Sequence, residues 1–207
     1  FHSDAAQAVG KIKINVKDMG IDLMSISAHK FYGPKGIGAL YIRSVPRIRL
    51  SPLIDGGGQE INLRSGTLPV PLCIGFGEAA KIAKKNLYSE AKKTKKLRDY
   101  FITSLKKKID DIIINGDMKN RLPANINFSI PKIKSKKIIK SLKHTIISSG
   151  SACTSSSIDP SYVLSGMGLA KNIVESSLRV GIGRFNSKRD INKAVQDIYQ
   201  TVNLLRK

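Results

Sequence analysis

The stretch SAHKFYGPKGIG, residues 27–38, decides how this chain is interpreted. Residues 21–26 before it alternate apolar and polar side chains, which predicts a strand that ends at the first serine of the stretch. Its glycines and proline predict a tight turn, and residues 39–42 predict the next strand. Lys30 is therefore expected on a short connection between strands, where the backbone fixes the position of its amine. The alternative is an ordinary solvated lysine.

Length and cysteine content limit the class of protein. With 207 residues the chain is long enough to bury a core as one or two domains. Its apolar runs stay well short of the roughly 20 residues that span a bilayer, so no membrane association is expected. Two cysteines do not predict a disulfide framework, and we expect a reducing compartment with at least one free thiol.

The net charge of +21 raises the question of nucleic-acid binding. The lysines, however, gather on expected helix faces, as in residues 92–96 and 106–108, without the interleaved aromatic side chains that stack on bases. The chain is also rich in Ile and Asn, a combination typical of an AT-rich genome, which adds lysine to solvated faces. Nucleic acid is therefore not expected as the main partner.

Three further motifs accompany the stretch at residues 27–38. They are FHSDAAQ at residues 1–7, RSGT at 64–67 and SSGSACTS at 148–155. Together the four motifs resemble the cysteine desulfurases, which are pyridoxal-phosphate enzymes of the aminotransferase class V type, and most closely their iron–sulfur-cluster (NifS/IscS) branch. Each motif alone is weak to moderate, whereas four in this order are specific. The resemblance extends over nearly the whole chain.

The resemblance implies an α/β fold of the fold-type I class of pyridoxal-phosphate-dependent transferases. Residues 1–86 would be the C-terminal part of the cofactor-binding large domain. Residues 87–207 would form an α+β small domain whose loop 148–159 carries the catalytic cysteine. Because the chain starts with Phe1, it is interpreted as the C-terminal half of a longer protein. The upstream half would carry the glycine-rich phosphate loop, a histidine that stacks on the cofactor and an asparagine, so activity is not expected of this chain alone.

The resemblance also implies which residues bind pyridoxal phosphate. Lys30 would hold the cofactor as a Schiff base, and its amine would move the substrate Cα proton. Asp4 would keep the ring nitrogen protonated so that the ring accepts electrons, and Gln7 would donate to the ring oxygen. From the residues alone, Asp4 and Gln7 share one face of a short helix expected at Ser3–Val9, where Asp4 could equally be a first-turn carboxylate.

Phosphate contacts are implied for three more residues. Ser27 and His29 would hold the cofactor phosphate, and His29 is also a candidate for a catalytic position beside the reacting sulfur; the sequence leaves both roles open. Thr67 would contact the phosphate of the partner subunit, which implies a homodimer, although it could instead cap a helix that begins near Pro71. The glycine-rich residues 54–60 are expected to be a mobile segment rather than a phosphate-binding loop.

The residues expected to bind the substrate and to carry the sulfur lie in the C-terminal half of the chain. Residues 148–159 are nearly all small and polar, which predicts an exposed mobile loop and an accessible Cys153 thiol. The resemblance makes Cys153 the catalytic nucleophile and a transient ligand of an iron–sulfur cluster shared with a scaffold protein. Arg179 would bind the substrate carboxylate, unless it is an ordinary strand residue. Cys73 is expected to be a buried small hydrophobe.

The remaining pattern predicts alternating helices and short strands. Ser187 with an acidic residue three positions later is close to a capping box at the start of the last helix. We expect helices at 71–85, 89–109, 134–143, 160–167 and from 187 onward, and strands at 112–114, 125–130, 145–148 and 177–185, the last with a turn.

The function implied by the resemblance is removal of sulfur from L-cysteine, which leaves L-alanine and an enzyme persulfide for iron–sulfur cluster assembly. The implied partners are an iron–sulfur scaffold protein and other sulfur acceptors, in the bacterial cytoplasm or, alternatively, in mitochondria. The alternatives are a selenocysteine lyase, another class V aminotransferase-type enzyme, a basic binding module, or an inactive fragment.

Overall fold

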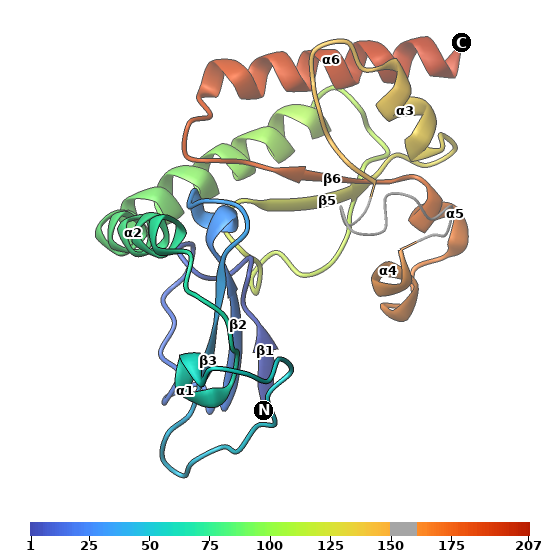
Figure 1. The fold of residues 1–207 in the computed structure, drawn as a ribbon. Helices are drawn as coiled ribbons and strands as arrows, with labels where there is room; N and C mark the ends of the chain where they lie inside the picture. The colour runs from blue at the N-terminus through green and yellow to red at the C-terminus, as the bar shows by residue number, and fades with distance from the viewer. Residues whose placement is uncertain (150–160) are drawn as a thin grey trace. The chain divides into compact units, whose positions relative to one another are not determined.

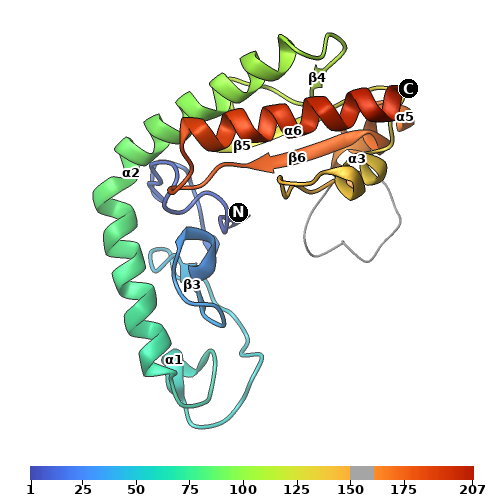
Figure 2. The same cartoon turned by 90° about the horizontal axis from the view of Figure 1, so that it is seen from above.

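The computed structural model describes residues 1–149 and 161–207 (Figures 1 and 2). The chain forms two compact units, Phe1–Ser89 and Glu90–Lys207, each with helices and a three-stranded sheet. The long helix α2 (Val70–Lys106) begins in the first unit and ends in the second. Within the described ranges, no helix combines the length and the apolar character needed to cross a bilayer. The predicted domain limits, 1–86 and 87–207, stay a prediction.

The sheet of the first unit contains both parallel and antiparallel pairs. Its order is β1-β2-β3, with β1 parallel to β2 and β2 antiparallel to β3. A 3-10 turn, η1, follows β2 directly, as the sequence predicted for a short connection after a strand. The bounds are β1 (His2–Asp4), β2 (Leu23–Ser27), η1 (Ala28–Phe31), β3 (Gly38–Ile42) and the single turn α1 (Gln59–Asn62).

One face of this sheet packs into a small apolar core, and two residues of the turn η1, Ala28 and Phe31, are buried. Met24 of β2 packs with Ala5 and Ile21 on that face. Phe31, the last residue of η1, packs against Ala79 and Ala83 in the N-terminal part of α2. Because the Phe31 ring is almost fully buried, η1 and the residues just before Phe31 are held against the helix.

Two helices expected from the sequence differ in the structure. The helix expected at Ser3–Val9 is absent: the first residues are strand β1, which pairs with β2, and the Ala5 N–H extends this pairing to the Ser25 carbonyl at 3.0 Å. The helices expected at 71–85 and 89–109 are one continuous helix, α2. The Asn86 amide and Ser89 hydroxyl donate to carbonyls within that helix, so neither residue ends it.

The second unit is built on an antiparallel sheet with the order β4-β5-β6. The apolar side chains of β5 and β6 point to one face, where the C-terminal part of α2, α3 and α6 cover them (Figures 1 and 2). The opposite face of β5 and β6 carries polar side chains. The bounds are β4 (Ile113–Ile114), β5 (Asn125–Ser129), α3 (Ser135–Ser141), α4 (Tyr162–Gly166), α5 (Lys171–Glu175), β6 (Ser177–Gly181) and α6 (Lys188–Arg206).

The start of α6 follows the sequence prediction. The Asp190 N–H donates to the Ser187 hydroxyl oxygen, and the Ser187 N–H donates back to the Asp190 carboxylate at 2.8 Å, which completes the capping box. The strand expected at 145–148 is reduced to one isolated bridge, from Ser148 to Arg179.

Candidate active site

Four of the predicted cofactor residues lie at one edge of the first unit's sheet. Strands β1 and β2 run parallel, so their carboxyl ends meet at the same edge. Asp4 is the last residue of β1, Ser27 is the last residue of β2, and η1 follows with His29 and Lys30. The carboxyl edge of parallel strands is where α/β folds commonly bind ligands, so this edge is the candidate active site.

The turn after β2 positions Lys30. The Gly33 N–H donates to the Ala28 carbonyl oxygen at 3.0 Å, which closes the turn around Lys30. A Cβ at Gly33 would lie only 3.0 Å from both the Cβ and the carbonyl oxygen of Ala28, so a larger residue would crowd this closure. Lys30 is half-buried and His29 is exposed. The local sequence therefore leaves His29 exposed and holds the backbone of Lys30 in a closed turn.

Asp4 ends β1 and Gln7 lies on the turn that follows, so neither residue is on the expected helix. The Ala6 N–H donates to Asp4 Oδ1 at 2.9 Å, which shapes the start of the turn. The carboxylate of Asp4 remains exposed at the sheet edge. The Gln7 side chain is exposed too, and its Oε1 accepts a hydrogen bond from the Lys11 ammonium group at 2.8 Å.

Lys11 is a member of this site that the motif analysis did not include. Its side chain is partly buried, and burial together with the charge of Lys30 lowers the pKa of Lys11 below its usual value. The two ammonium groups therefore share one electrostatic environment. The signal available in the sequence was the four-residue spacing between Gln7 and Lys11, which places the two side chains together in a helix or in successive turns.

Sequence reasoning also missed His2, which lies on the same face of the β1–β2 sheet as Asp4 and Ser27. In the parallel register His2 lies opposite Leu23 and Asp4 lies opposite Ser25, so His2 and Asp4 share a face with Ser27. The His2 Nε2 and the Ser25 hydroxyl lie 2.9 Å apart in a hydrogen bond across the strands. This face therefore carries a hydrogen-bonded polar pair next to the predicted cofactor residues, although Leu23 and Leu40 also lie on it.

Thr67 is not brought to these residues within the described part of the chain. The loop before it is well supported: the Ser65 N–H donates to the Ile54 carbonyl at 3.2 Å, and the Gly66 N–H donates to Gln59 Oε1 at 3.1 Å. Thr67 itself is exposed, and none of the described hydrogen bonds joins it to Lys30. Its role at a partner subunit stays a prediction.

The second unit contains the predicted substrate residue. Arg179 lies on the polar face of β6, opposite Asn127 of β5. Its backbone exchanges two hydrogen bonds with Ser148, from Ser148 N to Arg179 O at 3.2 Å and from Arg179 N to Ser148 O at 2.5 Å. The segment that contains Cys153 begins two residues after Ser148. Cys153 itself, predicted as nucleophile and transient cluster ligand, lies outside the described residues.

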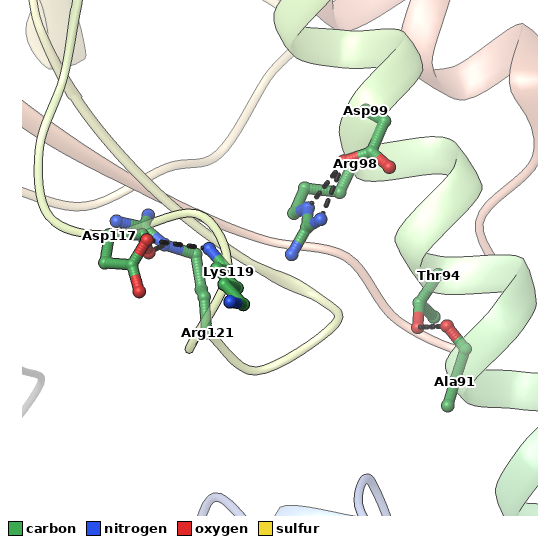
Figure 3. A network of polar contacts seen from close by, with 7 residues as sticks. All are labelled: Ala91, Thr94, Arg98, Asp99, Asp117, Lys119 and Arg121. Carbon is green, nitrogen blue, oxygen red and sulfur yellow. Dashed lines mark hydrogen bonds and ion pairs between the residues drawn. The ribbon is translucent and has the colours of Figure 1, made fainter.

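A separate polar network in the second unit is structural (Figure 3). The buried Arg98 guanidinium donates from Nε and Nη2 to one carboxylate oxygen of Asp99, at 2.9 and 2.7 Å. Arg121 donates from Nε to the Asp117 carbonyl at 3.0 Å, and burial and the charge of Arg98 lower the pKa of Arg121. The Asp117 carboxylate accepts from the Lys119 N–H at 2.8 Å. The contacts of Asp117 and Arg121 bind the turn after β4 to itself, whereas the Arg98–Asp99 ion pair lies within α2.

Metal binding by the described residues is not indicated. In residues 1–149 and 161–207, no three or more His, Cys, Asp or Glu side chains gather as ligands of an ion. Cys73, the cysteine within these ranges, is a free thiol and partly buried on α2. It is therefore less buried than the sequence suggested.

Comparison with protein families gives one match over most of the chain. The aminotransferase class-V family matches residues 1–194. The chain is 49% identical over 207 residues to cysteine desulfurase IscS of Ehrlichia chaffeensis, covering 100% of this chain and 50% of that protein. It is 47% identical over 206 residues to the human protein named cysteine desulfurase, of which it covers 45%. The chain thus spans about half the length of the curated relatives it matches.

Solved structures give the same result for the fold. The NifS-like protein from Rickettsia africae superposes with a TM-score of 0.88 at 33% identity, covering 98% of this chain and 53% of that one. A structure described as SspA in complex with cysteine superposes with a TM-score of 0.66 at 35% identity, covering 90% of this chain and 51% of that one.

Proposed function

Because the chain belongs to the aminotransferase class-V family, we propose that it is part of a pyridoxal-phosphate-dependent cysteine desulfurase. The family match and the NifS-like neighbours confirm the predicted α/β architecture of fold-type I. The observation that carries the proposal is the convergence of Asp4, Ser27, His29 and Lys30 at the carboxyl edge of β1 and β2. This convergence occurs in a chain whose sequence is 49% identical to two proteins named cysteine desulfurase IscS.

The groups at this edge fit the chemistry of pyridoxal phosphate. The cofactor has an aldehyde, a ring nitrogen, a ring oxygen and a phosphate. The edge offers an amine at Lys30, a carboxylate at Asp4, an amide at Gln7, and a hydroxyl and imidazole at Ser27 and His29. The exposed Asp4 carboxylate and the turn-held Lys30 amine are the two groups that distinguish this set from an ordinary polar edge.

When bound, the cofactor supplies an electron sink for the bonds at the substrate Cα. Asp4 holds a proton on the ring nitrogen and keeps it charged. Lys30 accepts the proton from the substrate Cα and returns it later, and the turn closed by Gly33 keeps its amine in place for both transfers. Ser27 and His29 hold the phosphate. Each of these roles is proposed from the position of the side chain at the sheet edge.

Arg179 and Cys153 complete the proposed reaction with L-cysteine. The Arg179 guanidinium binds the substrate carboxylate with two parallel hydrogen bonds. The Cys153 thiolate attacks the substrate sulfur, an S–S bond forms, and the substrate C–S bond breaks with its electron pair left on carbon. That carbon takes up a proton, so the products are L-alanine and an enzyme persulfide, and the step needs no external oxidant. The backbone bridge from Ser148 to Arg179 supports this pairing, since it fixes Ser148, which comes five residues before Cys153 in the sequence, beside Arg179.

The proposal extends to partners and location. The enzyme acts as a homodimer in which Thr67 reaches the phosphate bound to the other subunit. The Cys153 persulfide passes sulfur to an iron–sulfur scaffold protein and other acceptors, with a transient shared cluster at Cys153. The compartment is the bacterial cytoplasm, which keeps thiols reduced.

The test is turnover of L-cysteine by the protein purified at its natural length and supplied with pyridoxal phosphate. We expect L-alanine and a persulfide in equal amounts before an acceptor is added. Cys153→Ser should abolish both products yet still bind L-cysteine, because the amine chemistry does not use this thiol. Cys73→Ser is the matched control and should retain turnover. Parent-level alanine from Cys153→Ser would instead identify a lyase-type reaction that does not use this nucleophile.

A further inference from the structure

The hydrogen bond between Lys11 and Gln7 determines which end of the Gln7 amide faces outward. The Lys11 ammonium group has donors only, so the amide atom at 2.8 Å must be the oxygen. The nitrogen of Gln7, with its two N–H donors, therefore points away from Lys11. Without this contact the amide could present either end, because its two ends are nearly the same in size.

The turn after β1 is shaped so that Lys11 lies next to η1. Gly10, immediately before Lys11, has a φ of +74°, a conformation that glycine adopts readily. A Cβ on Gly10 would lie 3.0 Å from the Phe31 Cβ and 3.1 Å from the Ala83 Cβ, so a larger residue would be both strained and crowded here. Phe31 is the neighbour of Lys30 in η1. The packing thus places Lys11 beside the turn that carries Lys30.

We propose that Lys11 is a positioning residue that orients the Gln7 amide with its N–H donors toward the ring oxygen of the cofactor. The inference rests on the proposed function, since it needs a cofactor with an anionic ring oxygen at this edge. It goes beyond that function because it gives a role to Lys11, whose amine takes no part in the bonds made or broken. The lowered pKa of Lys11, caused by burial and by Lys30, supports the placement of its ammonium group near the reacting amine.

A structural role alone predicts a different pattern of effects. A lysine that only ties the turn together would lower thermal stability when removed, whatever happens at Gln7. A lysine that acts through Gln7 would change the bound cofactor, and this change would disappear once Gln7 is removed. A double-mutant cycle separates the two roles.

The experiment uses the protein purified at its natural length with pyridoxal phosphate as the probe. Lys11→Met, Gln7→Ala and the double variant are compared by cofactor affinity, absorption maximum of the bound cofactor, and melting temperature. We expect Lys11→Met to weaken cofactor binding about 3- to 10-fold, the size of one hydrogen bond, and to shift the absorption maximum. The double variant should match Gln7→Ala. Lys11→Arg keeps a donor and should restore the spectrum, and the exposed Lys13→Met is the matched control.

The possible outcomes separate this inference from the proposed function. If the parent protein binds pyridoxal phosphate but Lys11→Met has its normal affinity and spectrum, the positioning role is wrong and the proposed function stands. The same holds if the effects of Lys11→Met and Gln7→Ala simply add. If the parent protein does not bind pyridoxal phosphate at all, the proposed function fails and the inference fails with it.

Discussion

Asp4 lies opposite Ser25 in the parallel ladder between β1 and β2. Two residues after Ser25, β2 ends at Ser27 and the turn with Lys30 begins. A carboxylate and an amine from distant parts of the chain are therefore held at one sheet edge by backbone pairing rather than by a direct contact between their side chains. Rigid strands fix such positions better than loops do, which suits the proposed binding of one cofactor by both groups.

Asp4→Asn should lower kcat by about 100-fold or more, because a preorganised charge next to the reacting system is lost. The cofactor should remain bound, since Lys30 and the phosphate contacts are unchanged. Steady-state turnover of L-cysteine and the absorbance of the bound cofactor measure the two effects. Asp18→Asn, at an exposed carboxylate that accepts from Asn15, is the control and should behave like the parent. Near-parent turnover of Asp4→Asn would remove Asp4 from the site.

Lys30 should be the residue that carries the cofactor. Treatment of the loaded protein with borohydride, followed by digestion and mass spectrometry, should find the reduced cofactor on the peptide with Lys30. Lys30→Ala should give no labelled peptide. Lys35→Ala, at an exposed lysine in the same connection, should be labelled like the parent. A label on Lys35 or Lys11 in the parent protein would contradict the assignment.

Arg179→Gln should lower kcat/KM for L-cysteine by about 10- to 100-fold, the loss expected for charge-assisted hydrogen bonds to a carboxylate. Most of the change should be in KM, because the carboxylate is bound before and after sulfur transfer. Cysteamine, which lacks the carboxylate, should be affected much less by the substitution. Arg206→Gln, which removes a surface ion pair with Asp111, is the control and should leave kcat/KM unchanged. Equal losses with both substrates would show that Arg179 does not contact the carboxylate.

Asp190 makes folding stability depend on pH. Hydrogen bonds from the side chain and the backbone of Ser187 hold the pKa of Asp190 below its usual value. A carboxyl whose pKa is lower in the folded state stabilises folding when ionised. This contribution is present above about pH 4 and is lost as the pH falls through the folded-state pKa. Melting temperature between about pH 5 and 2 should therefore fall less steeply for Asp190→Asn than for the parent.

The exposed Asp110 provides the control for this pH experiment. Asp110→Asn should keep the pH dependence of the parent. If Asp190→Asn and Asp110→Asn gave the same slope of melting temperature against pH, the capping box would not be the source of the acid sensitivity.

The sequence by itself determined the features that depend on residue types at short spacing. The turn around Lys30 follows from its glycines and proline, and the capping box of α6 follows from Ser187 and Asp190. The order of the four motifs by itself indicated the family. Such local signals are reliable because the hydrogen bonds that they predict are formed between near neighbours in the chain.

Only the tertiary structure decided where those residues lie. Asp4 was expected on a helix, but pairing of its strand with β2 took the backbone hydrogen bonds that a helix would have used. The contact of Lys11 with Gln7 and the bridge from Ser148 to Arg179 were likewise not predicted. For β1 and for the bridge the physical reason is the same: distant segments compete for the same backbone partners, and the outcome depends on packing that no local pattern encodes. Lys11 and Gln7 are only four residues apart, but the spacing alone does not say which local side-chain pair forms once the turn has packed.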